Sequence, residues 1–204
     1  MSMLSCRVLC LLAIVLCCVG LTHAAPANGG MAKFIEQARE KVKETLRLKE
    51  DCANVATTAR EAANEAFVFA RETESKLATI AADPNEVEKT KTKGRKLIEN
   101  ATKAADNAKE VAENAIQSAT QTESEADLYL KEGERADALK AAEEADKAAH
   151  AAITDIEAAK THANDVENVL QKLDAEVAAA EKKEKQLESQ PHRQTKETSL
   201  GEQQ

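Results

Sequence analysis

The tripeptide Asn100-Ala101-Thr102 matches the acceptor pattern for N-linked glycosylation, in which an asparagine amide is joined to a sugar. If Ala101 belongs to the buried face of a helix, Asn100 points outward and is sterically open. An unmodified, solvent-facing helix asparagine is the alternative interpretation. The sequence therefore makes Asn100 a candidate glycosylation site.

A single cysteine, Cys52, lies in the body of the chain. The other four cysteines all fall in the first eighteen residues, at Cys6, Cys10, Cys17 and Cys18. If that leader is removed, no disulfide can form within the chain. The position of Cys52 in an apolar helix seam favours a buried, small apolar residue. The functional alternative is an intermolecular disulfide that links two copies into a homodimer.

The histidines and carboxylates do not form patterns that indicate catalysis or metal binding. His150 and His162 are twelve residues apart on one expected helix, without a His or Cys partner three or four residues away. Carboxylate pairs such as Glu143-Glu144 are typical of a solvated helix face with cations four residues away. Nucleophile elbows, phosphate loops and dinucleotide fingerprints do not occur. We therefore predict no enzyme activity, no catalytic residues, no cofactor and no metal site.

These residues lie in segments whose apolar positions recur every three or four residues. The clearest segment is 142–187, where only Glu184 interrupts an otherwise apolar seam. The average spacing of 3.5 residues is that of a coiled-coil seam and predicts one long helix. Alanine dominates the seam, so helices can approach closely but gain little hydrophobic free energy per layer. The seam positions are Ala142, Ala145, Ala149, Ala152, Ile156, Ala159, Ala163, Val166, Leu170, Leu173, Val177, Ala180, Glu184 and Leu187.

The same periodicity predicts two further long helices earlier in the chain. We expect helices over 32–82, 84–131 and 135–188. Asp83 suits an N-cap, Pro84 the first helical position, and Glu86 the position that reaches back to the cap. Gly133 is expected to cap the second helix and allow a turn, although a helix that continues through it is an alternative.

Together these segments predict an all-α fold. The expected architecture is an elongated three-helix up-down-up bundle, or antiparallel coiled coil, over 32–189. Residues 25–31 are expected to form a flexible lead, and residues 190–204 a disordered polar tail.

Residues 1–24 have the features of a signal peptide. Arg7 precedes an apolar stretch at 8–19 that is short for a membrane span, and Thr22-His23-Ala24 places small residues before a cut after Ala24. An uncleaved anchor is the alternative. The tail contains no apolar run of the kind that precedes a lipid anchor, so we expect no C-terminal anchor signal in this chain. Either the protein is released, or a downstream segment is missing from this sequence. We therefore expect a secreted, extracellular or cell-surface protein.

Composition restricts the classes of partner. Aromatic residues make up 2% of the chain, which disfavours a dense globular core. The net charge of −8 makes nucleic acids and anionic membranes poor partners in the absence of a basic patch. The expected helices are too polar to cross a bilayer, so the mature chain should not span a membrane. A protein partner that the sequence does not identify, or a second copy of the chain, remains open.

The leader, with Ser5-Cys6-Arg7-Val8-Leu9-Cys10 followed by Cys17-Cys18, resembles the Cys-rich leaders of trypanosomatid surface proteins, including the mucin-associated surface proteins. The body, with runs such as Lys109-Glu110-Val111-Ala112-Glu113, is similar to their variable regions and to alanine-rich trypanosome surface proteins that fold as elongated three-helix bundles. This resemblance implies display at a host interface. The missing anchor signal departs from those families, and no functional residue carries over.

Three hypotheses follow. The first is a secreted or cell-surface helical bundle, without enzyme activity, that acts as a coat, decoy or adhesion module. The second is a stress-protective protein like the late-embryogenesis-abundant group, which also uses Ala-Lys-Glu runs. The third is a structural coiled coil that oligomerises through its long helices. The regular seam at 142–187 argues against the second hypothesis, because a disordered protective chain needs no continuous apolar stripe.

Overall fold

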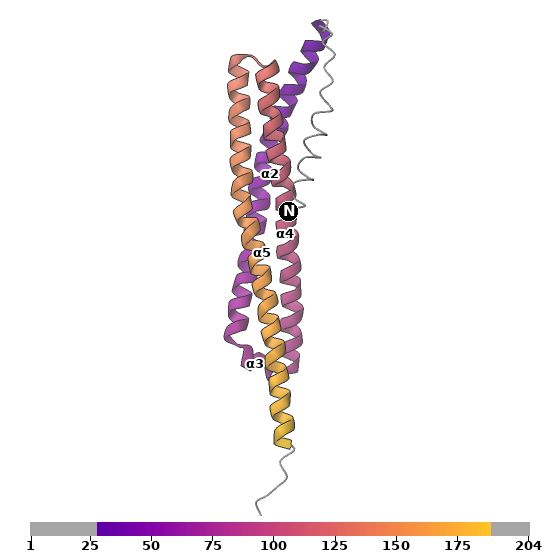
Figure 1. Cartoon of the computed structure of the whole chain (residues 1–204), viewed down its shortest axis with the longest axis vertical. Coiled ribbons are helices and arrows are strands. Elements are labelled where there is room, and N and C mark those ends of the chain that lie inside the picture. Colours follow the sequence, from indigo (N-terminus) through magenta and orange to yellow (C-terminus); the bar gives the residue numbers. More distant parts are fainter. Residues whose placement is uncertain (1–27, 189–204) are drawn as a thin grey trace, which may run out of the picture. The chain divides into compact units, whose positions relative to one another are not determined.

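The computed structural model describes residues 28–188, which form helices α2 (Asn28–Ser75), α3 (Leu77–Ala81), α4 (Pro84–Tyr129) and α5 (Glu132–Glu188) (Figure 1). The predicted signal peptide and the predicted disordered tail lie outside these residues. No strand occurs within 28–188, so the prediction of an all-α fold is confirmed. The helix count differs from the prediction, because a short helix, α3, follows the first long one.

The chain divides into two compact units, Met1–Gln37 and Ala38–Gln204. In the first unit, the described residues 28–37 form the beginning of α2. Residues 28–31 are thus helical, although the sequence predicted a flexible lead up to residue 31. The second unit contains the rest of α2 and all of α3, α4 and α5, and the packing described below lies within it.

The break between α2 and α3 was not predicted, since neither proline nor glycine is present there. Lys76 leaves the helical conformation at φ −122° and ψ 13°, and its N–H donates to the Thr73 carbonyl at 3.0 Å. The Ser75 hydroxyl donates to the Glu72 carbonyl at 2.8 Å, which competes with continuation of the helix. After the break, Leu77 packs against a cluster of buried apolar side chains. This tertiary contact outweighs the local helix propensity.

Asp83 caps α4, as the sequence predicted. Its side chain accepts a hydrogen bond from the Asn85 backbone N–H at 2.9 Å, and Pro84 occupies the first turn. Glu86 does not reach back to the cap, which corrects the expected capping box. Its carboxylate accepts from Lys89 at 2.8 Å, while the Asp83 N–H donates to the Ile80 carbonyl at 3.1 Å. The backbone N–H of Asp83, which Glu86 was expected to bind, is therefore satisfied by the Ile80 carbonyl of α3.

The turn between α4 and α5 lies earlier than predicted. Leu130 caps α4 in an extended conformation, at φ −94° and ψ 149°, and its N–H donates to the Ala126 carbonyl. Gly133 therefore does not cap α4 but lies in the first turn of α5. An extended residue at position 130 needs no glycine, which explains why the glycine signal misplaced the turn.

Alanine forms most of the core. Three of the core clusters contain residues from each of α2, α4 and α5. A fourth cluster contains residues of α4 and α5 only, and lies toward the turn that connects them. The larger apolar side chains gather at the α3 end, where Phe69, Leu97, Val166 and Val169 are buried together. Because burial stabilises by about 25 cal/mol per Å² of apolar surface, this end contributes the most free energy per layer.

The contacts between helices fix their relative directions. Pairs between α2 and α5 keep a nearly constant separation in sequence, 95 residues at Arg39–Glu134 and 98 at Glu74–Lys172, so these helices run parallel. Between α2 and α4, Thr45 contacts Thr122. Cys52 contacts Val111, so the partner number falls as the α2 number rises. Helices α2 and α4 are therefore antiparallel.

The last part of α5 extends beyond the helices that cover its seam. Leu173 is fully buried, Val177 is half-buried, and every residue from 178 to 186 is exposed. The predicted seam included Ala180 and Glu184, which no helix within the described residues covers. In Figure 1 this segment is the yellow end of α5, which continues past α3.

Gly94 lies where α4 packs closely against Phe69 of α2 and Leu170 of α5. A Cβ at this position would come within 2.9 Å of Leu170 Cδ1 and 3.1 Å of Phe69 Cε1, whereas a Cβ at Gly133 would meet nothing within 4 Å. We expect Gly133→Ala to stabilise by about 0.5–1 kcal/mol through helix propensity. Gly94→Ala should destabilise the protein, because the added Cβ overpacks the contact with Leu170 and Phe69 at a cost of about 1–3 kcal/mol, which exceeds the gain in helix propensity. Urea unfolding of both variants measures the difference, and equal free energies of unfolding would contradict the close packing.

Candidate functional site

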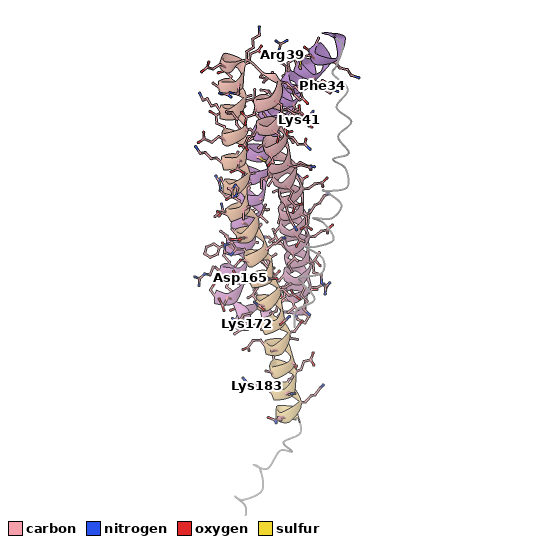
Figure 2. The ribbon with its side chains drawn as sticks, turned by 45° about the horizontal axis from the view of Figure 1, so that its top comes forward. Phe34, Arg39, Lys41, Asp165, Lys172 and Lys183 are labelled. Carbon is pink, nitrogen blue, oxygen red and sulfur yellow. The ribbon has the colours of Figure 1, made fainter. Side chains whose placement is uncertain are left out.

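A row of ion pairs joins α2 to α5, and we call it the α2–α5 ladder. Its members are Arg39–Glu134, Lys49–Glu144, Arg60–Asp155 and Glu74–Lys172. The Arg60 guanidinium contacts Asp155 through two nitrogens, at 3.0 and 2.8 Å, and the Asp155 side chain is only 14% exposed. Figure 2 labels Arg39 and Lys172, near the two ends of the ladder. The nearly constant sequence separation of these pairs matches a single register of the two parallel helices.

The ladder shifts the pKa values of its groups in the direction that favours the charged forms. The hydrogen bond from Lys49, and then its charge, lower the pKa of Glu144, and Lys172 lowers the pKa of Glu74 in the same way. The hydrogen bond to Asp155 raises the pKa of Arg60. Carboxylates with a lowered pKa stabilise the fold above their unfolded value of about 4.3, and this contribution is lost as the pH falls. Solvent and salt weaken it, because these groups are exposed.

Three buried hydroxyls join α2 to α4, and we call them the hydroxyl cluster. Thr45 Oγ1 lies 2.7 Å from both Ser118 Oγ and Thr122 Oγ1. All three side chains are buried, with Thr45 completely so. Within residues 28–188 no buried side-chain nitrogen or oxygen lacks a hydrogen-bond partner. The cluster therefore fixes the register of α4 on α2 without leaving an unsatisfied polar atom.

Asn100, the candidate glycosylation site, lies near the middle of α4. Asn100 and Thr102 are exposed, and Ala101 between them is completely buried. The geometry thus agrees with the expectation that the asparagine points away from the core.

Cys52, the candidate for an intermolecular disulfide, is completely buried in the core. It packs in a cluster with alanines from α4 and α5, and its Sγ lies 3.7 Å from the Val111 carbonyl oxygen. Burial, and to a smaller extent the charge of Asp51, raise the pKa of the thiol. A thiol with a raised pKa contains little of the reactive thiolate at neutral pH.

We expect Cys52 of the native protein to react slowly with a chromogenic disulfide reagent at pH 7, and rapidly after denaturation. Cys52→Ser should leave a stable monomer, because serine can also donate to the Val111 carbonyl. A non-reducing gel checks the second statement. A dimer that Cys52→Ser abolishes would show that the thiol is used between chains.

The two histidines lie apart, as the sequence suggested, but one belongs to a group that we did not predict. The ring of His162 lies 5.0 Å from that of Phe67, and its Nδ1 is 2.9 Å from Asp165 Oδ2. Arg71 Cζ lies over the Phe67 ring, 5.5 Å from the ring centroid. His150 Nδ1 lies 2.9 Å from the Asp146 carbonyl. The pairs Phe67–Arg71 and His162–Asp165 are local to one helix, whereas the contact between Phe67 and His162 depends on the α2–α5 register. No local sequence pattern could have revealed that contact.

Most of the charged side chains in the described residues lie on the helix surfaces. Glu143 pairs with Lys147 four residues later, as expected for a solvated helix face. No group of three metal-ligating side chains gathers within 28–188. A shallow polar depression is lined by α4 alone, including Glu99, Lys103 and Asp106, and one helix face does not enclose a ligand. None of the described helices is both long and apolar enough to span a membrane.

Comparison with known proteins finds no family model, no curated protein and no solved structure that matches this chain.

Proposed function

We propose that this chain is a secreted or cell-surface helical-bundle protein that acts through its exterior, as a coat, decoy or adhesion module at a host interface. In this proposal the three long helices form an elongated up-down-up bundle, and α3 closes one end. The mature chain carries out no reaction and needs no cofactor. The observation that carries the proposal is the alanine core shared by α2, α4 and α5. The small core side chains let the helices pack closely, and the function is then assigned to the exposed surface of the bundle.

The features of residues 1–24 support the proposal that the protein is secreted or displayed at the cell surface. Residues 1–24 have the charge, apolar stretch and small residues of a cleaved signal peptide. The single cysteine of the body, Cys52, is buried, which suits a chain that folds in an oxidising compartment without forming wrong disulfides. The resemblance of the leader to those of trypanosomatid surface proteins supports the same direction.

Small-angle X-ray scattering and circular dichroism on residues 25–204, under reducing conditions, test the architecture. We expect a highly helical rod with monomer mass and a length of at least about 85 Å, since the 57 residues of α5 span that distance at 1.5 Å each. A rod of about twice this length, or a doubled mass, would favour the oligomeric coiled coil. Low helicity with an expanded chain would favour the stress-protective protein.

Expression with the native leader in eukaryotic cells tests the route. We expect the protein in the medium, with its N-terminus at Ala25. Retention in the cytosol with residues 1–24 attached would contradict secretion.

Binding of the labelled, purified protein to cultured mammalian cells tests the adhesion role. Saturable binding would favour an adhesion module, and no binding would favour a passive coat.

The ladder provides a test of the parallel α2–α5 register that the proposed bundle requires. Arg60→Asp should lower the melting temperature, because it places a second carboxylate beside the largely buried Asp155. The charge swap Arg60→Asp with Asp155→Arg should recover most of the loss, because the attraction is restored with opposite polarity. Thermal melts at low and high salt measure both. If the swap recovers nothing, the two residues do not pair in solution.

A further inference from the structure

We propose that Asn100 carries an N-linked glycan, and that the glycan can be attached only before α4 folds. The inference rests on the proposed secretory route, since the transferase that makes this bond works in that compartment. Asn100-Ala101-Thr102 is the only acceptor tripeptide among the nine asparagines of the chain.

The fold accommodates a glycan at this position. Asn100 is exposed, and the neighbouring residues one turn away, Lys96 and Lys103, are also exposed. The buried positions nearby, Leu97, Ala101 and Ala105, face the core and leave the asparagine side chain in water. A sugar on Asn100 therefore displaces no core contact.

The folded helix, however, cannot be the substrate of the transferase. The acceptor pattern requires a hydroxyl two residues after the asparagine, which indicates that one active site reads both side chains together. Residues two apart in an α-helix point about 200° apart and do not face each other. In α4 the buried Ala101 lies between the two exposed side chains. Asn100 and Thr102 can meet in one active site only on an extended chain, before α4 forms.

In the transfer step, Nδ2 of Asn100 attacks the anomeric carbon of the first sugar of a lipid-pyrophosphate-linked oligosaccharide. The new carbon–nitrogen bond forms as the bond from that carbon to the pyrophosphate oxygen breaks. The lipid pyrophosphate leaves with the electron pair, and the amide nitrogen loses one proton. No oxidant or reductant is needed.

The helix contains two matched controls, spaced seven residues apart along α4. Asn107 and Asn114 are exposed, and each is followed by a completely buried alanine, as is Asn100. They differ in the third residue, which is Lys109 after Asn107 and not a hydroxyl residue. These positions separate the effect of the acceptor tripeptide from that of the helix surface.

Cell-free translation of the full chain with endoplasmic-reticulum membranes tests the proposal, with a reporter acceptor tripeptide appended after Gln204. We expect two glycans that an amidase for N-linked glycans removes, and one in Asn100→Gln or Thr102→Ala. Asn107→Gln and Thr102→Ser should keep both glycans. Lys109→Thr should add a third. Protein that is translated and folded first, and given membranes with permeabilising detergent afterwards, should remain unmodified at Asn100.

The outcomes distinguish this inference from the proposed route. A modified reporter with an unmodified Asn100 would overturn the glycan and leave the secretory route intact. Absence of both glycans would overturn the route and the glycan together. Modification of Asn100 in the folded protein would overturn the requirement for an unfolded acceptor.

Discussion

Replacing Ile156 with aspartate is expected to unfold most of the helical core. Ile156 is 6% exposed, and all the side chains in its cluster are apolar. The other buried members are alanines, at Ala59, Ala63, Ala105, Ala108 and Ala159, and Val55 packs against them. None of these side chains can accept or donate a hydrogen bond to a carboxylate. An unpaired buried charge costs about 3–5 kcal/mol, which is a large part of the stability of a typical domain. The circular dichroism signal at 222 nm and the melting temperature should both fall sharply.

Ile153→Asp is the matched control for this experiment. Ile153 lies one turn earlier on the same helix and is 38% exposed, so a carboxylate there stays in water. The control should change stability by less than about 0.5 kcal/mol. Equal melting temperatures for the two variants would show that α5 does not bury the face on which Ile156 lies.

Thr45→Val is expected to destabilise the protein by about 1–3 kcal/mol, although valine has nearly the shape of threonine. The substitution removes the shared partner of Ser118 and Thr122, which lie 4% and 1% exposed. A buried hydroxyl without a partner costs about 1–3 kcal/mol. The two remaining hydroxyls can turn to the carbonyls four residues before them, which keeps the loss within this range. Urea unfolding at constant pH measures it.

The apolar triple variant Thr45→Val, Ser118→Ala and Thr122→Val distinguishes the cost of an unpaired buried hydroxyl from the cost of a changed side-chain shape. Removing all the polar partners together leaves nothing unsatisfied, so stability should return to within about 1 kcal/mol of the parent. A triple variant as unstable as the sum of its single changes would show that the hydroxyl cluster does not form in solution. Thr57→Val, on an exposed residue of the same helix, is the control for β-branched substitution.

The sequence predicted those features of the fold that depend on local signals. The three- and four-residue spacing located the long helices, and Asp83-Pro84 marked the beginning of α4 because a cap and a proline act on the nearest backbone groups. The seam from Ala142 to Leu173 is buried at almost every position, so periodicity alone identified that face. The prediction that Gly133 caps α4 was wrong, because Leu130 ends the helix in an extended conformation that any residue can adopt.

Features that depend on contacts between distant segments could not be predicted. The break at Lys76 arises because Leu77 packs into a cluster formed by three helices. The ladder and the hydroxyl cluster depend on how helices separated by 95 and 77 residues align. The sequence does contain a weak signal for the hydroxyl cluster, since Thr45 and Thr122 are polar residues at seam positions that are mostly apolar. Two polar residues in facing seams could have been paired, but only with the register known.

The small size of the core side chains also affects how the protein responds to temperature. Heat capacity rises on unfolding in proportion to the apolar surface that becomes exposed, and an alanine exposes far less of it than a leucine. A core in which Ala59, Ala105 and Ala149 occupy central positions should therefore unfold with a small heat-capacity change for its length. Its free energy of unfolding then varies little with temperature around the maximum. Such a protein would keep nearly constant stability over a wide range of working temperatures.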